Sequence, residues 1–301
     1  MKYFDLHCDT LCVCSQKQKP LYNNGLHVDL AYANLFETYI QCTAAFVHDE
    51  WENPFQTAIN SFKEIGNTPV IKSNNDLVQS QRNGGAYFLP TIENSISLEG
   101  KIENIQKFAD IGVKVMSFTW NADNQLGGGI MGQNNGITEF GVKALEEMER
   151  LSIVPDLSHA SEKLFYDVAS KTNKPLIATH SNAKTLCKHP RNLTDEQIKE
   201  IINRNGLIGI NFFKAFLTDN GENCTTDSII KHIDYFLSLG AKNVLAMGSD
   251  FDGCSLPEDM LGLKSIPDLY EKMLKLNYKQ KLVDKIFFEN AYNFFENAFT
   301  L

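Results

Sequence analysis

The chain has 301 residues, 43% of them hydrophobic, and a formal net charge of −9. These values fit an ordinary globular protein of one large or two small domains. The acidic balance and the lack of any Lys/Arg run exclude a nucleic-acid partner. No apolar run reaches the roughly 18 residues of a membrane span, and acidic residues interrupt the N-terminus, so we expect neither a membrane anchor nor a signal peptide. Seven cysteines without a secretory signal indicate free thiols and a cytoplasmic location.

Short β-branched or aromatic runs alternate with amphipathic stretches along the whole chain. The runs predict eight strands, which end near His7, Val47, Ile92, Thr119, Leu157, Thr179, Phe212 and Ser249. Helical periodicity is clearest over residues 98–111, 138–151, 162–170, 194–204, 226–239 and 277–295. This alternation predicts an α/β fold, a single (β/α)8 barrel of the TIM type that forms one domain over residues 1–301. A doubly wound open sheet is the alternative, but it favours a glycine-rich phosphate loop after the first strand, where this chain has His-Cys-Asp.

Local signals add one helix start and two long loops. Thr194 followed by Gln197 is a capping box, which predicts a helix beginning there. Long loops are expected over residues 8–29 and 121–136. The second loop holds Gly127-Gly128-Gly129, which is compatible with a phosphate cradle; without a Gly-Lys-Ser/Thr sequence, a mobile active-site loop is the better interpretation.

The end of the first strand carries residues that can bind a metal. In a strand, Asp5, His7 and Asp9 share one face, so an imidazole and a carboxylate can reach the same divalent ion. Such a run also occurs as a helix cap or a turn salt bridge. A thiolate zinc site at Cys8, Cys12 and Cys14 is a further alternative, but no second cysteine pair supports it.

Further metal-binding residue types recur at later strand ends, where the active site of a (β/α)8 barrel lies. A lone histidine there is often structural, so the inference rests on the whole set. Three histidines and three carboxylates exceed the four-ligand shell of one zinc and suit two ions about 3.5–4 Å apart, bridged by a carboxylate. The set is His7, Asp9, Glu93, His159, His180 and Asp250. The other histidines, His27, His48, His189 and His232, are predicted not to be ligands.

Six motifs at these positions are specific to a family. They are Asp5-Leu6-His7-Cys8-Asp9-Thr10, Ile92-Glu93-Asn94-Ser95, Asp156-Leu157-Ser158-His159, Thr179-His180-Ser181-Asn182-Ala183, Pro190-Arg191-Asn192-Leu193 and Gly248-Ser249-Asp250-Phe251-Asp252-Gly253. Over nearly its whole length the chain resembles the membrane (renal) dipeptidases and their bacterial relatives, a branch of the amidohydrolase-like superfamily marked by His-x-Asp on the first strand. The resemblance implies that His7 and Asp9 bind one zinc, His159 and His180 the other, and that Glu93 bridges both. Another divalent metal would also suit these ligands.

The resemblance also implies a reaction. A hydroxide bridging two zinc ions attacks the peptide carbonyl of a dipeptide, and an acid then protonates the leaving amine. Asp250 and Asp252 both qualify as this acid by sequence, and the family pattern favours Asp250. Arg191 is expected to clamp the substrate carboxylate, the alternative being a surface charge near a helix N-terminus. Members of the family are often dimers, so the resemblance implies a homodimer.

One position departs from the family. Trp120 stands where relatives such as the renal enzyme have a histidine thought to contact the scissile carbonyl, and an indole N–H can donate one hydrogen bond but carries no charge. We expect either a substrate class with less need for that contact or a neighbouring donor such as Asn121 to compensate. Trp120 and Asn121 are both predicted to bind substrate. Two other functions stay open: hydrolysis of N-acyl amino acids, and a weakly catalytic protein that binds metal and peptide.

Overall fold

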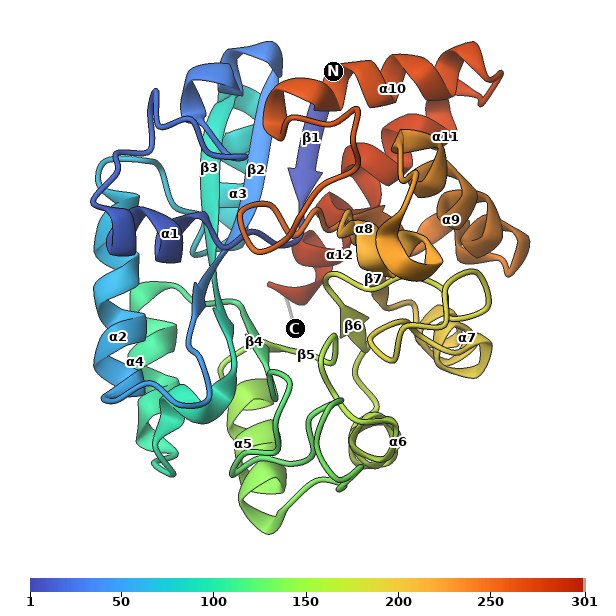
Figure 1. Ribbon diagram of the computed structural model, residues 1–301. Helices are drawn as coiled ribbons and strands as arrows, with labels where there is room; N and C mark the ends of the chain where they lie inside the picture. The colour runs from blue at the N-terminus through green and yellow to red at the C-terminus, as the bar shows by residue number, and fades with distance from the viewer. Residues whose placement is uncertain (300–301) are drawn as a thin grey trace.

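The sheet of this protein is a closed barrel. In the computed structural model, which describes residues 1–299, eight parallel strands pair in chain order and the last pairs with the first (Figure 1). The predicted (β/α)8 barrel is confirmed, and each predicted strand end lies within two residues of the observed one. The strands are β1 (Lys2–Asp5), β2 (Thr38–Phe46), β3 (Gly85–Glu93), β4 (Val115–Ser117), β5 (Val154–Asp156), β6 (Ile177–Ala178), β7 (Leu207–Ile210) and β8 (Leu245–Met247).

Helices surround the barrel and follow most of its strands (Figure 1). The predicted helices are present, and the capping box of Thr194 and Gln197 starts one of them as expected. The α-helices are α1 (Thr10–Lys17), α2 (Pro54–Ser61), α3 (Asn74–Asn83), α4 (Glu103–Ile111), α5 (Glu139–Arg150), α6 (Glu162–Lys171), α7 (Asp195–Asn203), α8 (Lys214–Leu217), α9 (Thr226–Ser238), α10 (Ile266–Lys275), α11 (Gln280–Asp284) and α12 (Asn290–Ala298).

Three local expectations need correction. The loop expected over residues 8–29 begins with α1, a helix of 8 residues whose Leu11, Cys12 and Cys14 are buried. Such a short helix is stabilised by packing rather than by its own periodicity, which is why its pattern was too weak to predict it. The helix expected over 277–295 is divided into α11, a π-helical turn (Lys285–Glu289) and α12. The segment 98–111 begins with a 3-10 turn (Ser95–Leu98), and α4 starts only at Glu103.

One end of the barrel is closed by the end of the described chain. Phe4 of β1 stacks on Phe295 of α12, with ring centroids 5.4 Å apart. Both belong to a buried apolar cluster that also contains Ile40, Leu89 and Leu207 from other strands. Because α12 covers the end where the strands begin, the end where they finish is left for the loops. No helix in the described part of the chain combines the length and the apolar character needed to cross a membrane.

The segment after β4 is irregular, as expected for residues 121–136, and it is tied together by one carboxylate. Asp123 accepts hydrogen bonds from the backbone N–H groups of Gly129 (3.0 Å) and Gln133 (3.3 Å), and from the side chain of Asn135 (2.7 Å). The N–H of Gly129 is thus used within the loop, and a Cβ at any of the three glycines would lie within 3 Å of another atom, so the run is closely packed and not an open phosphate cradle. Whether the loop moves during catalysis stays a prediction.

Candidate metal centre

The six residues predicted as ligands or acid converge at the end of the barrel where the strands finish. His7, Glu93 and His180 form one compact group, and His7 forms a second with Asp9 and Asp250; within each group the ligand atoms lie within 4.8 Å of one another. His159 contacts the group that contains Glu93, because its Nε2 lies 2.9 Å from Oε1 of Glu93. The cluster borders a cavity of about 580 Å³ that is also lined by Arg191, Trp120 and Asn121. No such group among residues 1–299 contains a cysteine, so the thiolate alternative is not supported.

Backbone hydrogen bonds beyond β1 and β8 bring together the second group, His7, Asp9 and Asp250. The N–H of Asp9 donates to the carbonyl of Phe251 (2.9 Å), and the N–H of Asp250 donates to the carbonyl of His7 (3.2 Å). Asp250 adopts φ 62°, a left-handed conformation that costs a non-glycine residue about 1–3 kcal/mol and is typical of functional sites. A Cβ at Gly253 would lie 2.0 Å from Asp9 Oδ2, so only glycine leaves room for that carboxylate.

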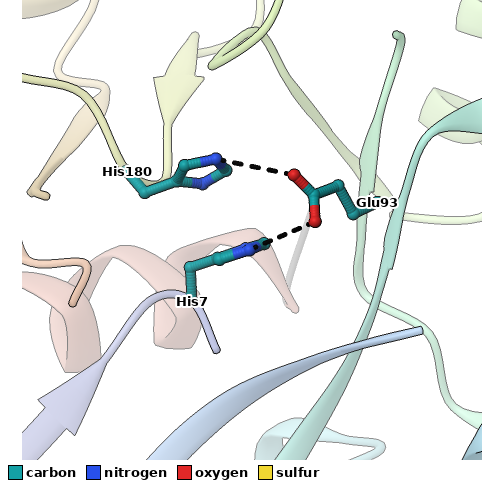
Figure 2. A group of neighbouring side chains, drawn as sticks. All are labelled: His7, Glu93 and His180. Carbon is teal, nitrogen blue, oxygen red and sulfur yellow. Dashed lines mark ion pairs between the residues drawn. The ribbon is translucent and has the colours of Figure 1, made fainter. Parts of the chain in front are cut away.

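Glu93, at the end of β3, lies between the histidines. Its Oε2 is 3.4 Å from Nε2 of His7, while its Oε1 is 2.9 Å from Nε2 of His159 and 3.7 Å from Nε2 of His180. Figure 2 shows the two oxygens of Glu93 turned toward His7 and His180. A carboxylate that presents one oxygen to each side has the geometry required of a bridging ligand.

Hydrogen bonds fix which ring nitrogen of His180 faces the centre. The hydroxyl of Thr179 donates to Asp156 Oδ2 (2.7 Å), so it can only accept from Nδ1 of His180, 2.8 Å away. Nδ1 of His180 therefore carries the proton, and Nε2 keeps a free lone pair. Asp156 is held in turn by Ser117 Oγ (2.8 Å) and by the N–H of Thr179 (2.9 Å).

The same argument holds for His159. Its Nδ1 lies 3.1 Å from Asn121 Oδ1, which can only accept, so Nε2 of His159 is also unprotonated. The Nε2 atoms of His159 and His180 then face each other at 3.0 Å with no proton between them. Two lone pairs at this distance repel unless a cation lies between or beside them. Metal-bound histidines commonly donate the N–H of their other ring nitrogen to an acceptor, as His159 and His180 do here.

The donor set fits divalent cations in further ways. Nε2 of His7 and Oδ1 of Asp9 are buried without any hydrogen-bond partner. Burial lowers the pKa of His159 and His180 well below the usual range, with Arg191 and His7 adding to the effect. At His7 burial is outweighed by the carboxylates of Glu93 and Asp9, which raise its pKa well above the usual range. The field that retains a proton on His7 also attracts a metal cation.

The structure separates two aspartates that the sequence left equivalent. Asp252 accepts from Thr10 Oγ1 (2.6 Å) and from the backbone N–H groups of His27 (2.7 Å) and Val28 (3.2 Å), so its carboxylate is fully engaged in holding loops. Asp250 instead has Oδ1 3.9 Å from Nε2 of His7, while Oδ2 accepts from Asn211 Nδ2 (2.9 Å). Asp250 is therefore the aspartate at the centre.

Asn211 is a site residue that our sequence analysis missed. It follows β7, a strand to which no site residue had been assigned, and its side chain touches both Asp250 and the carbonyl of His180 (3.3 Å). The signal was present, because Asn211 is the polar residue that ends the apolar run Leu207–Ile210. Asparagine is not among the usual ligands of zinc, so its residue type alone did not mark Asn211 as part of the site.

Arg191 is buried beside the centre, so the alternative of a surface charge is wrong. Its guanidinium donates to the carbonyl of Ser158 and to that of His180 (3.4 Å), and it lies over the ring of Phe216, 5.4 Å from the ring centroid. Its Nε has no partner. Burial lowers the pKa of Arg191 to about 10, against the opposing effect of Asp250 and Glu93. Arg191 is thus a buried cation that lines the cavity and keeps one donor without a partner.

Trp120 and Asn121 both line the cavity. The indole of Trp120 lies with its centroid 6.2 Å from the ring of His159, so it is next to the centre and not in the barrel wall. Asn121 has its Oδ1 occupied by His159. Its first role is thus to orient a histidine, which the sequence did not indicate.

A parallel-barrel fold with histidines and carboxylates clustered where the strands end is the arrangement typical of metal-dependent hydrolases. A family model described as membrane dipeptidase (peptidase family M19) matches residues 1–300. The chain belongs to this family, and it is accordingly a metallopeptidase that uses divalent metal and acts on small peptides.

Individual proteins are also similar to this chain. An uncharacterized protein of Klebsiella pneumoniae, in the pqqA 5′ region, is 34% identical over 217 residues, which is 69% of this chain and 80% of that protein. The crystal structure of dipeptidase AC, a family M19 metallopeptidase, superimposes with a TM-score of 0.90 at 24% identity, covering 100% of this chain and 99% of that one. A Rhodobacter sphaeroides metallopeptidase liganded with a phosphinate mimic of L-Ala-D-Ala gives a TM-score of 0.89 at 23% identity, covering 99% of each chain.

Proposed function

We propose that this protein is a dipeptidase with two zinc ions per chain. His7 and Asp9 would hold one ion, His159 and His180 the other, and Glu93 would bridge them. The observation that carries this proposal is the placement of Glu93, whose two oxygens face histidines on opposite sides. When bound, the ions supply a Lewis acid for the scissile carbonyl and activate a shared water.

The chain's own residues have separate tasks in this reaction. Arg191, with its unpartnered Nε, would bind the free carboxylate of the substrate and so set the distance from that carboxylate to the bond that is cleaved. Asp250 would take the proton of the attacking water on Oδ1 and deliver it to the leaving amine, because Asn211 already occupies Oδ2. Asn121 would hold His159 and present its own amide N–H to the substrate.

The buried cation favours cleavage of the bond that lies one residue from a free carboxylate. The internal bonds of long peptides have no carboxylate at that distance, whereas the single bond of a dipeptide does. N-acyl amino acids also end in a carboxylate, so they are the alternative substrates. The phosphinate dipeptide mimic bound by the Rhodobacter sphaeroides relative supports the dipeptide assignment.

The test is a substrate panel with controlled metal content. Protein stripped with a chelator and reloaded with zinc should bind close to two equivalents and hydrolyse dipeptides faster than N-acetyl amino acids. Preferential hydrolysis of the N-acetyl compounds would establish the alternative reaction. Metal binding without turnover of either class would identify a weakly catalytic binding protein.

Three remaining assignments belong to the same proposal. We propose one domain over residues 1–301 and a cytoplasmic location, consistent with seven free cysteines. We also propose a homodimer, for which sedimentation or light scattering of the purified protein is the direct measurement.

A further inference from the structure

One side of the cavity is built almost entirely of rings. Phe46 and His48 come from the end of β2 and the loop after it, Trp51 follows in the same loop, and Trp120 lies after β4. The centroid of Trp120 is 5.2 Å from that of Phe46 and 5.0 Å from that of His48, and Phe46 is 5.5 Å from Trp51. All four line the cavity and are half-buried. We call these four residues the aromatic wall.

Hydrogen bonds between loops of the protein itself hold the aromatic wall in place. Asp49, between His48 and Trp51 in the chain, accepts from Asn94 Nδ2 (2.6 Å) and from the N–H of Ala122 (3.2 Å). These bonds join the loop after β2 to the loops after β3 and β4. The wall is therefore organised in advance, which lowers the entropy that binding would otherwise cost.

The aromatic wall contains no carboxylate, lysine or arginine that would select a charged side chain. Nδ1 of His48 accepts from the N–H of Glu50 (3.2 Å), so this ring nitrogen is already occupied. Both carboxylate oxygens of Asp49 are already bonded. What remains for a substrate is a set of ring faces and edges, which favour an apolar or aromatic partner.

The opposite side of the cavity contains the cation. Arg191 lies there with Phe216, and His189 packs on Phe216 with centroids 4.4 Å apart. Arg191 and His189 come from the loop after β6, which lies across the barrel from β2, the strand that leads into Phe46, His48 and Trp51. Phe216 follows β7, and Trp120 follows β4, between the two sides. A dipeptide with its carboxylate at Arg191 and its scissile carbonyl at Glu93 thus directs its first residue toward the aromatic wall.

We propose that the aromatic wall makes the protein selective for dipeptides whose first residue carries a large apolar or aromatic side chain. This inference rests on the proposed dipeptidase function and on the clamp at Arg191. Apolar pockets discriminate by roughly 10- to 200-fold for a single methylene. The expected preference for a phenylalanine over a glycine at the first position is therefore at least about tenfold in kcat/KM.

The first test compares substrates that differ at one position. Native protein should cleave Phe-Ala and Leu-Ala at least about tenfold more efficiently than Gly-Ala. Trp51→Ala should remove most of this preference while leaving the ratio of Ala-Phe to Ala-Gly unchanged, and Trp51→Phe should retain it. A native ratio near one, or an effect of Trp51→Ala on the second position instead, overturns the inference while the dipeptidase function stands.

The second test needs no turnover. The chain has two tryptophans, and both belong to the aromatic wall, so its intrinsic indole fluorescence reports from this cavity. Titrating zinc-loaded protein with phosphinate dipeptide mimics should change the emission, with a Kd at least about tenfold lower for a phenylalanine-like than for a glycine-like first residue. Equal affinities overturn the inference. Failure to hydrolyse any dipeptide is a separate result, which refutes the proposed function and leaves this binding comparison to decide the inference.

Discussion

The candidate metal centre has two unlike halves. In the first, His7 has carboxylate oxygens of Glu93, Asp9 and Asp250 at 3.4, 3.5 and 3.9 Å from its Nε2. In the second, His159 and His180 share a single carboxylate oxygen, Oε1 of Glu93. The pKa of His7 is raised by the carboxylates against the effect of burial, whereas burial lowers the pKa of the other two. One residue type thus meets opposite electrostatics within a single site.

The difference predicts different chemistry for the two halves. Carboxylate oxygens suit harder ions such as manganese, and imidazole nitrogens suit zinc. The first half also contains Asp250, the proposed acid, and is fixed by strand-end backbone bonds. The second half is fixed by side chains, Thr179 and Asn121, and lies closest to the aromatic wall through Trp120. We therefore regard the first half as the proton-handling side and the second as the side that orients the substrate carbonyl.

The largest effect on metal binding is expected for a change at Glu93, the residue that both halves of the centre share. Glu93→Gln keeps the shape of the side chain but removes the charge that both halves use, so both ions should be lost together. The loss of affinity should exceed the roughly 10- to 100-fold typical of supporting residues, because a direct ligand is changed. Elemental analysis of the purified variant measures this. One ion still bound tightly, as in native protein, would refute the shared-ligand arrangement.

Asp250→Asn should impair the chemistry while sparing the second half. Loss of a positioned acid or base lowers kcat by about 10²–10⁴. Asp252→Asn is the matched control, since that carboxylate bonds to Thr10, His27 and Val28 instead of facing the centre. It should reduce thermal stability and leave kcat within about tenfold of native. Equal losses of kcat in the two variants would show that the assignment of the proton-handling side is wrong.

Arg191→Ala tests the clamp that orients the substrate across the two halves. Losing one partner of a buried charged contact should cost about 2–4 kcal/mol in kcat/KM on dipeptides. Dipeptide amides, which lack the carboxylate, should be poor substrates of native protein and nearly unaffected by the change. Parallel losses on acids and amides would mean that Arg191 acts only on the fold, through its bonds to Ser158 and His180.

Sequence alone predicted the fold and most of the centre for a simple physical reason. A polar residue that ends an apolar strand points into the mouth of the barrel, and this locates Glu93, His180 and Asp250 without three-dimensional information. The distinction between Asp250 and Asp252 could not be made that way. Alternation by two assumes a strand, but β8 ends at Met247, and both aspartates have positive φ, 62° and 66°.

The hydrogen bonds that orient His180 and His159 could not be predicted from sequence, for a different reason. The chain from Asp156 through Thr179 to His180 depends on β5 and β6 lying side by side, and the contact of Asn121 with His159 depends on the path of an irregular loop. Neither spacing in the sequence nor residue type encodes such pairings. α1 was missed similarly, because its burial against the barrel, not its pattern, stabilises it.

The smallest effect is expected for a change at Thr179, and it tests most directly whether the two halves bind their ions independently. Thr179→Val removes the acceptor that holds the proton on Nδ1 of His180, while Asp156 Oδ2 keeps its bond from Ser117. The free ring can then carry its proton on Nε2, the atom that faces the centre. Affinity for the ion of the second half should fall about 10- to 100-fold, and the first half should keep its ion.

A competing chelator titration of zinc-loaded protein resolves the two affinities. Thr91→Val is the control, because the buried hydroxyl of Thr91 in β3 has no hydrogen-bond partner to lose. If Thr179→Val weakens both ions equally, or if Thr91→Val does the same, the variant acts through packing and the halves are not independently supported. If only one ion is weakened, the tautomer of His180 is the property that Thr179 controls, and the two halves can be tuned separately.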